Sequence, residues 1–316
     1  MQKLVYKEDY PTPTPGPDDV LVKVHYCGIC GSDVINFRYK MYQVPLIMGH
    51  EISGEIAEIG ENIKDINIGD NVIAINVSQY VMGELKGLGV FEDGGFAEYV
   101  KVRRSNVFYP PTSISAKEAV MIESFANIMR AIRMSMIENN QRIMIIGGGN
   151  IGLAFLVTLL CEKSPEYVIV IEPHEFLREK AKDFGAIDSF PPSKAKIRKF
   201  IKKHRQPSFV FDCVGSEETI RMAIDLIQRG GIVLLEGIQK GMVIHTFPII
   251  NKEICLKGCL GHDRNDIIST IELFAKNKIN ADKFITKTIA LEDVQETFES
   301  FMKLDKRDFI KILIEI

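Results

Sequence analysis

The chain has 316 residues, which at roughly 150 residues per domain is enough for about two domains. Apolar residues make up 46% of the chain, charged residues make up 26%, and the formal net charge is −3. This composition excludes global disorder, and the small negative charge argues against a nucleic-acid partner. No apolar run approaches the roughly 18 residues of a membrane span, and residues 1–15 lack the apolar core of a signal peptide. Six dispersed cysteines suit a reducing compartment, so we expect a cytoplasmic protein.

The N-terminal third predicts a compact, mostly β domain. Val20, Val22 and Val24 alternate with the residues between them, which is the period-two pattern of a half-buried strand. Residues 52–56 form a second such stretch. Turn sequences separate the short apolar stretches, at Pro15-Gly16-Pro17, Gly60-Glu61-Asn62, Gly69-Asp70-Asn71 and Asp93-Gly94-Gly95.

Beyond residue 115 the pattern changes to alternating helices and strands. We expect a helix over 115–138, with Ser115 as N-cap and Glu118 at the capping-box position. Continuously apolar strands then alternate with helices; the strands are 142–146, 167–171, 208–211 and 232–235, and the helices are 151–161, 175–184 and 217–228. Because both faces of such strands must be buried, the pattern predicts an α/β domain with a doubly wound parallel sheet. Further helices are expected at 265–275 and 291–302, and a closing strand of alternating apolar and polar residues at 310–316.

A strongly basic stretch occupies residues 193–205. A phosphate-binding role is one interpretation. Ile197, Phe200 and Ile201 favour the other, because they give an amphipathic helix its apolar stripe and leave the basic side chains in solvent.

A glycine-rich turn predicts dinucleotide binding. Residues 147–152 fit G-x-G-x-x-G directly between an apolar strand and an apolar helix. Gly147 allows the tight turn, Gly149 lets the backbone approach a pyrophosphate, and Gly152 lets the helix pack close to the strand. Asn150 and Ile151 open the helix, whose free N–H groups suit phosphates. The alternative is a glycine-rich turn that binds no ligand.

The choice between NAD and NADP depends on Glu172, which ends the second strand of this region. Its carboxylate suits the ribose hydroxyls and would repel a 2′-phosphate, so we expect NAD rather than NADP. Arg178 and His174 are nearby cations, and Arg178 is expected to face solvent. The segments 212–215 and 236–238 follow later strands. We expect them, including Gly237, on the nicotinamide side of the cofactor site.

Three metal-binding residue types lie next to two of the N-terminal strands. Cys27 and Cys30 form a C-x-x-C pair, which is typical of a redox site or of half a structural zinc site. The sequence has no second C-x-x-C, and His50 and Glu51 follow further along. A thiolate, an imidazole and a carboxylate are what a catalytic zinc uses, with one position left open, and Glu123 can supply a further oxygen.

These motifs together resemble those of the zinc-dependent medium-chain dehydrogenases, most nearly the sorbitol (polyol) and threonine dehydrogenases. The resemblance rests on Cys27-Gly-Ile-Cys30-Gly-Ser-Asp33, Gly49-His50-Glu51, Gly94-Gly95-Phe96-Ala97-Glu98-Tyr99 and residues 147–152, which occur in the family's order. It implies a GroES-like catalytic domain with a Rossmann domain inserted. We therefore expect a catalytic domain over 1–124, an NAD-binding domain over 125–263 and a C-terminal return to the catalytic domain over 264–316.

The resemblance also implies roles for individual residues. Cys30, His50 and Glu51 match the positions of the zinc ligands, and Glu123 matches a carboxylate that ligates or backs the metal. Cys27 matches no ligand. Two further residues have implied roles: Asp33 would orient His50, and Ser32 would take the substrate proton.

The sequence departs from the family in two places. Residues 70–93 are shortened and contain no cysteine, so the structural zinc that the family usually carries should be absent, leaving one zinc per chain. Ile35, beside Asn36, stands where the family often has a histidine that passes the proton to solvent, and water can take over that step.

The function implied by the resemblance is transfer of a hydride between NAD and a secondary alcohol or polyol, or its ketone, with zinc polarising the oxygen. Residues 36–44 are expected to face the substrate; Arg38, Tyr39 and Lys40 suit a polyol or a phosphorylated polyol. A homodimer or homotetramer without membrane or nucleic-acid partners is expected. Two alternatives stay open: a zinc-free reductase of enones or quinones, and a non-catalytic cofactor- or metal-binding protein.

Overall fold

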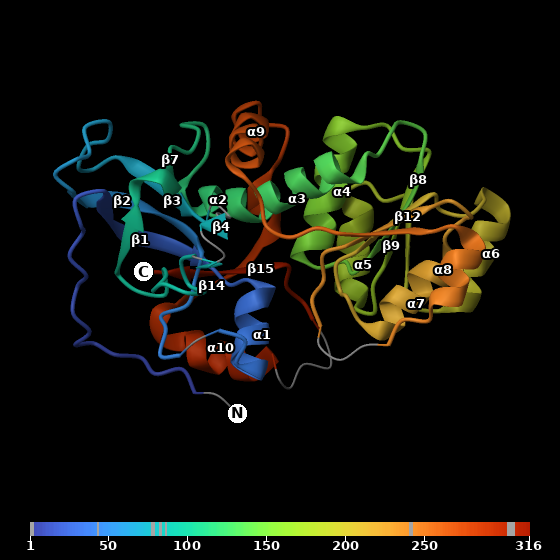
Figure 1. The fold of residues 1–316 in the computed structure, drawn as a ribbon, viewed down its shortest axis with the longest axis horizontal. Helices are drawn as coiled ribbons and strands as arrows, with labels where there is room; N and C mark the ends of the chain where they lie inside the picture. Colours follow the sequence, from blue (N-terminus) through green and yellow to red (C-terminus); the bar gives the residue numbers. More distant parts are fainter. Residues whose placement is uncertain are drawn as a thin grey trace. The chain divides into compact units, whose positions relative to one another are not determined.

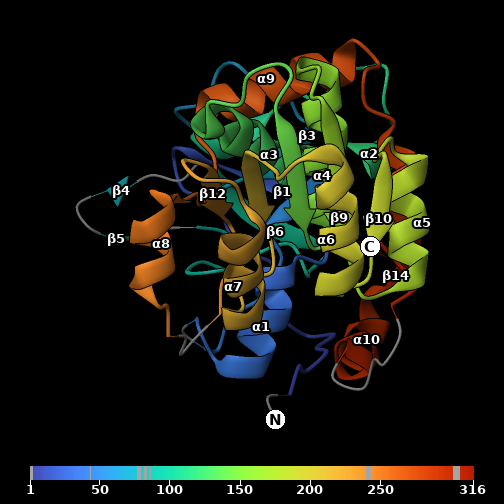
Figure 2. The same cartoon turned by 90° about the vertical axis from the view of Figure 1, so that its right-hand side faces the viewer.

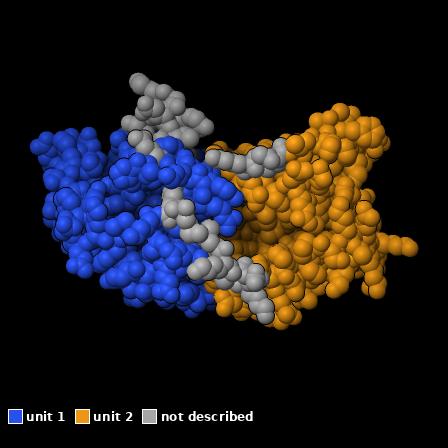
Figure 3. Space-filling view, turned by 90° about the horizontal axis from the view of Figure 1, so that it is seen from below, with its two compact units in different colours: residues 1–123, 262–305, 311–316 blue, residues 124–261, 306–310 orange. Residues whose placement is uncertain are grey.

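The computed structural model describes residues 3–42, 44–76, 80–81, 84–85, 87–239, 243–301 and 307–316. The chain forms two compact units, shown in different colours in Figure 3. Unit 1 consists of Met1–Glu123, His262–Asp305 and Lys311–Ile316, and unit 2 of Ser124–Gly261 and Lys306–Ile310. Within the described residues, no helix has the length and apolar character needed to cross a membrane.

Unit 1 is built on a seven-stranded sheet (Figure 1). Its strands are β1 (Asp19–Gly28), β2 (Glu51–Ile59), β3 (Asn71–Ile75), β6 (Tyr99–Arg103), β7 (Val107–Phe108), β14 (Ile285–Ala290) and β15 (Lys311–Glu315). The order is β14-β15-β1-β2-β3-β7, with β6 also paired to β1, and a separate ribbon joins β4 (Tyr80–Val81) to β5 (Glu84–Leu85). Val20, Val22 and Val24 point into the core and are fully buried, which confirms the period-two prediction for β1.

The helix predicted over 265–275 of unit 1 is confirmed, and the one predicted over 291–302 is shorter in the structure. The helices of unit 1 are α1 (Gly31–Tyr39), α2 (Ala116–Ala119), α9 (Arg264–Ala275), α10 (Val294–Phe301) and the 3-10 turns Arg104–Asn106, Ala281–Phe284 and Leu291–Asp293. The single helix predicted over 115–138 is wrong, because α2 ends at Ala119, with Val120 as its C-cap, and α3 (Met121–Ser135) begins after it. The predicted capping box is confirmed: the Ser115 hydroxyl accepts a hydrogen bond from the Glu118 amide at 3.2 Å.

Unit 2 is a doubly wound α/β domain with six parallel strands, as predicted. The strands are β8 (Arg142–Ile146), β9 (Tyr167–Ile171), β10 (Asp188–Phe190), β11 (Phe209–Asp212), β12 (Ile232–Leu235) and β13 (Cys255–Gly258), in the order β10-β9-β8-β11-β12-β13. The helices are α4 (Asn150–Glu162), α5 (Glu175–Asp183), α6 (Lys194–His204), α7 (Glu217–Leu226) and α8 (Thr246–Lys252). Figure 2 shows α5 beside β10 at one edge of this sheet. The strand order reverses between β8 and β11, where open α/β sheets bind ligands.

The apolar strands of unit 2 are buried on both faces, as their sequences require. Phe155 of α4 stacks on Phe211 of β11 with ring centroids 4.1 Å apart. Val210, between the two phenylalanines of β11, belongs instead to the core cluster that contains Ile197 of α6. Ile197 is fully buried while the lysines of α6 are exposed, so the solvated-face interpretation of the basic stretch is confirmed.

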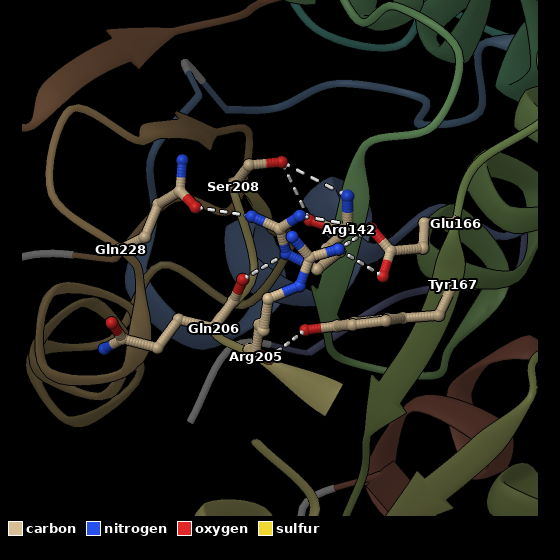
Figure 4. A network of polar contacts seen from close by, with 7 residues as sticks. All are labelled: Arg142, Glu166, Tyr167, Arg205, Gln206, Ser208 and Gln228. Atoms are coloured by element: carbon tan, nitrogen blue, oxygen red, sulfur yellow. Dashed lines mark hydrogen bonds and ion pairs between the residues drawn. The ribbon is translucent and has the colours of Figure 1, made fainter. Parts of the chain in front are cut away.

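A polar network lies where the strands of unit 2 begin (Figure 4). Arg142 and Arg205 both contact the carboxylate of Glu166, at 3.1 and 2.8 Å. Arg142 also reaches Gln228, and the Tyr167 hydroxyl donates to the Arg205 carbonyl at 2.9 Å. These contacts link the loops at the amino ends of the strands, at the opposite edge of the sheet from the glycine-rich turn that follows β8.

Candidate metal site and dinucleotide-binding turn

Cys30, His50 and Glu51 come together because β1 and β2 pair antiparallel. Gly28 at the end of β1 lies opposite Glu51 at the start of β2. Cys30 follows β1 directly and His50 precedes β2, so both side chains lie at the same end of this strand pair. One ligand atom from each of Cys30, His50 and Glu51 lies within 4.8 Å of the other two. This donor set, a sulfur, an imidazole nitrogen and a carboxylate oxygen, fits zinc and leaves a fourth position open.

Asp33 and Ser32 hold the imidazole of His50 from its two sides. Asp33 Oδ1 lies 3.6 Å from His50 Nδ1, and its Oδ2 accepts the Cys30 amide at 2.9 Å. Asp33 is fully buried, so one carboxylate orients both the histidine and the loop of the cysteine. Ser32 Oγ lies 3.4 Å from His50 Nε2. The structure therefore places all four of these sequence-predicted residues in one cluster.

The protonation of this cluster follows from its burial and its charges. Burial by itself would lower the pKa of His50, but Asp33 and Cys30 outweigh it and raise that pKa well above its usual value. Burial raises the pKa of Asp33. Burial also raises the pKa of Cys27 well above its usual value, so this side chain is a core thiol rather than a thiolate. A redox role for the C-x-x-C pair would need two reactive sulfurs, and Cys27 does not supply one.

Lys311 is a residue of this site that the sequence analysis missed. It opens β15 and is 2% exposed, and its ammonium forms an ion pair with Glu51 Oε2. The predicted strand over 310–316 assigned no role to this lysine. Gly28 makes room for the pair, since a Cβ at that position would lie 2.9 Å from Lys311 Cε. The charge of Glu51 raises the pKa of Lys311, although burial opposes it.

Glu123 lies near Cys30, His50 and Glu51 but is not one of the three residues whose ligand atoms come together. It is buried in the first turn of α3, and its Oε1 lies 3.9 Å from His262 Nδ1. Its charge acts on His50 in the direction that raises the pKa of His50. The region from which we expect a structural zinc to be absent, residues 70–93, is described only in part; residues 77–79, 82–83 and 86 lie outside the described residues.

The segment expected to face the substrate divides into two parts. Arg38, Tyr39 and Lys40 are exposed at the end of α1. Asn36 is buried, and its Oδ1 accepts the Tyr42 amide at 2.8 Å. Tyr42 is a second missed residue: burial raises its pKa to about 12, and the charges of Asp33 and Cys30 act in the same direction.

The glycine-rich turn of unit 2 has the geometry that a dinucleotide needs. Gly147 has a φ of 98°, and a Cβ on Gly152 would lie 1.9 Å from the Gly147 carbonyl oxygen. Gly149 is the N-cap of α4 and no side chain caps the helix, so the amides of its first turn, which includes Asn150 and Ile151, are left for a ligand. The side-chain Nδ2 of Asn150 donates to the Ser124 hydroxyl at 3.0 Å.

Glu172 is folded back onto this turn. Its Oε2 accepts the Gly148 amide at 2.7 Å and its Oε1 accepts the His174 amide at 2.9 Å. Arg178 does not face solvent as expected, because its guanidinium donates to the carbonyls of Glu172 and Pro173, the first at 3.0 Å.

The later loops also meet at the carboxyl ends of the strands. The Gly237 amide donates to the Asp212 carbonyl at 3.2 Å. A Cβ on Gly215 would lie 2.0 Å from the Gly237 carbonyl oxygen. Segments 212–215 and 236–238 therefore lie side by side, next to the glycine-rich turn that follows β8.

Comparisons with known proteins agree with this architecture. The model of the alcohol dehydrogenase GroES-like domain matches residues 16–112, and that of the zinc-binding dehydrogenases matches residues 151–276. The chain is 31% identical to D-arabitol-phosphate dehydrogenase of Enterococcus avium, over 97% of this chain and 92% of that protein. It is 26% identical to human sorbitol dehydrogenase, over 94% and 89% of the two chains.

A solved structure gives the same result. A short chain alcohol dehydrogenase from Escherichia coli, complexed with NADH, superposes with a TM-score of 0.87 and 26% identity, over 97% of this chain and 94% of that one. The chain is thus an enzyme of the dehydrogenase type, and it belongs to the zinc-binding medium-chain alcohol dehydrogenase family, in the branch of the polyol dehydrogenases.

Proposed function

We propose that this protein is a zinc-dependent, NAD-dependent dehydrogenase that interconverts a secondary alcohol of a polyol and the corresponding ketone. The observation that carries the proposal is the group formed by Cys30, His50 and Glu51, with the Ser32 hydroxyl against the same imidazole. The arabitol-phosphate and sorbitol dehydrogenases among its relatives support a polyhydroxylated substrate.

Each residue of the metal site has a distinct task in this proposal. Cys30, His50 and Glu51 would hold zinc, and Glu123 would be a further carboxylate that ligates or backs the metal. When bound, zinc supplies the positive charge that makes an alcohol oxygen acidic, and NAD supplies the hydride acceptor. Ser32 takes the proton that the alcohol loses as its own hydroxyl proton passes to water, and Asp33 keeps the His50 ring in the orientation that suits a metal ligand.

Unit 2 would bind NAD through the turn 147–149 and the first amides of α4. The Glu172 carboxylate favours NAD over NADP, because a 2′-phosphate placed near it would be repelled. Both oxygens already accept backbone amides, which holds this negative charge in place. We propose accordingly that unit 1 is the catalytic domain and unit 2 the cofactor domain.

We propose further that the protein is a cytoplasmic homodimer or homotetramer. Phe247 and Ile250 of α8 are 75% and 69% exposed, and exposed apolar side chains that lie close together favour association. The six cysteines all lie within the described residues and form no disulfide there, as in a reducing compartment.

The test is NADH formation at its absorbance band with a panel of polyols, phosphorylated polyols and simple secondary alcohols, with and without a chelator. The proposal expects turnover of at least one polyol, loss of turnover after zinc removal, and recovery when zinc is returned. A zinc-free reductase would instead reduce an enone at the same rate with and without the chelator. Absence of turnover with every alcohol in the panel, by a zinc-loaded protein that binds NADH, would contradict the proposal.

A further inference from the structure

An arginine outside every motif discussed above lies against the glycine-rich turn. Arg307 belongs to unit 2, although the segments on both sides of 306–310 belong to unit 1. Its Nη1 lies 3.2 Å from the position that a Cβ on Gly149 would take, and its Cζ lies 3.7 Å from it. Gly149 is the residue at which α4 begins. The guanidinium is therefore placed where the helix presents its free amides.

Contacts within its own segment hold the guanidinium at this place. Arg307 Nε donates to the Phe309 carbonyl and Nη2 donates to the Ile310 carbonyl, each at 3.2 Å. The Phe309 ring lies under the guanidinium, with the ring centroid 4.6 Å from Cζ. The Arg307 backbone amide also donates to His174 Nδ1 at 3.2 Å, which ties the segment to the end of β9. The side chain is held in position and does not depend on a ligand for its conformation.

The positive charge of Arg307 has no counter-charge at contact distance. Within the described ranges, no carboxylate oxygen lies within 4.0 Å of its nitrogens, and Nη1 makes no hydrogen bond. Glu172 attracts Arg307 electrostatically, but both of its oxygens already accept backbone amides. Burial lowers the pKa of Arg307, which remains a cation because guanidinium is too basic to lose its proton in a protein. A partly buried cation without an ion-pair partner is costly unless an anion binds beside it.

We propose that Arg307 binds the pyrophosphate of the dinucleotide, together with the amides at the start of α4. This inference rests on the proposed function, because it concerns the same cofactor. Helix N-termini bind phosphate through N–H groups alone, and a guanidinium adds charge-assisted hydrogen bonds with a fixed geometry. Nη1, the nitrogen without a partner, is the one beside Gly149.

The adenosine 2′-phosphate of NADP is the other anion that an arginine in this region could meet. Geometry favours the pyrophosphate, because Arg307 adjoins Gly149 and lies more than 4.0 Å from the oxygens of Glu172, the residue expected at the 2′-hydroxyl. Arg307 therefore raises the affinity for both cofactors and does not select NADP.

The experiment measures binding to the full-length protein rather than activity. Calorimetric titrations with NADH, NADPH, ADP-ribose, AMP and adenosine compare the wild type with Arg307→Ala, Arg307→Lys and the control Arg198→Ala. Arg198 is an exposed arginine on α6, so this control removes one positive charge from the same unit. Thermal unfolding of each variant verifies that it folds.

The proposal expects Arg307→Ala to weaken binding of NADH and ADP-ribose roughly 10- to 100-fold, the loss of one charge-assisted contact. AMP should lose less, since it has a single phosphate, and adenosine should bind as before. Arg307→Lys should recover part of the affinity, and Arg198→Ala should bind like the wild type.

Three results would overturn it: unchanged NADH affinity in Arg307→Ala, an equal loss for adenosine, or a larger loss for NADPH than for NADH. The adenosine result would mean that Arg307 acts on the nucleoside, and the NADPH result would mean that it binds the 2′-phosphate. Wild-type protein that binds none of the phosphate-containing ligands would refute the cofactor assignment itself. A failure to oxidise any alcohol, with ADP-ribose binding intact, would concern the proposed function alone.

Discussion

Replacing Lys311 by methionine should destabilise the metal-free protein far more than an ordinary surface lysine change. The ammonium of Lys311 and the carboxylate of Glu51 are 2% and 0% exposed, so the variant leaves a buried carboxylate without its cation. Removing one partner of a buried ion pair lowers the free energy of unfolding by about 3–5 kcal/mol. With a change of roughly 2–4 °C in Tm per kcal/mol for a unit of this size, Tm should fall by about 6–20 °C.

The matched control is Lys23→Met in β1. Lys23 and Glu55 form an ion pair at 3.7 Å, but their side chains are 50% and 37% exposed. An exposed pair of this kind contributes about 0–1 kcal/mol, so Tm should fall by a few degrees at most. Urea and thermal unfolding of both variants in the presence of a chelator give the comparison.

Two further arms test the physical cause. Adding Glu51→Gln to Lys311→Met removes the unpaired charge, so the double variant should recover much of the lost stability. Saturating zinc should stabilise Lys311→Met more than the wild type, because the metal supplies a cation beside the same carboxylate. The reasoning is refuted if Lys311→Met is as stable as Lys23→Met, or if the double variant is the least stable of the three.

Three other predictions concern the reaction, the cofactor and the metal. Ser32→Ala should keep its zinc and lower kcat roughly 10²- to 10⁴-fold, measured by metal analysis and steady-state kinetics, because it removes the group that takes the proton; unchanged kcat contradicts that role. Glu172→Ser should narrow the ratio of kcat/KM for NAD to that for NADP by about tenfold or more, and a wild type that prefers NADP would show the assignment to be wrong. The raised pKa of His50 means that protons compete with zinc at a higher pH than for an ordinary histidine. Zinc affinity from chelator competition should therefore weaken as pH falls, by up to about tenfold per pH unit for each proton displaced, and a pH-independent affinity would contradict it.

Local sequence patterns were sufficient for the elements with strong apolar periodicity. The predicted limits of β8, β9 and β12 agree with the structure residue for residue, because each is an unbroken apolar run that parallel sheets bury on both faces. The strand β13, Cys255–Gly258, was missed, since an edge strand that contains lysine and glycine carries no such run. The helix α1 was missed as well, because its apolar residues do not form one clear stripe.

The site shows the same division between local and long-range information. Cys30, His50 and Glu51 could be identified because each lies in a short motif, and the pairing of β1 with β2 then brings them together. Lys311 and Arg307 could not, because their partners are far away along the chain: Glu51 for the first and the turn at Gly149 for the second. A lysine in a strand predicts a solvated side chain until the tertiary structure shows that the strand is central.

Metal content per chain tests the central claim most directly. Elemental analysis of the purified wild type and of Cys30→Ser, paired with NADH titration of both proteins, separates the metal site from the cofactor site. The account predicts one zinc per chain in the wild type and almost none in Cys30→Ser, with NADH binding retained in both. Zinc retained at the wild-type level by Cys30→Ser, or two tightly bound zinc ions per wild-type chain, would contradict it.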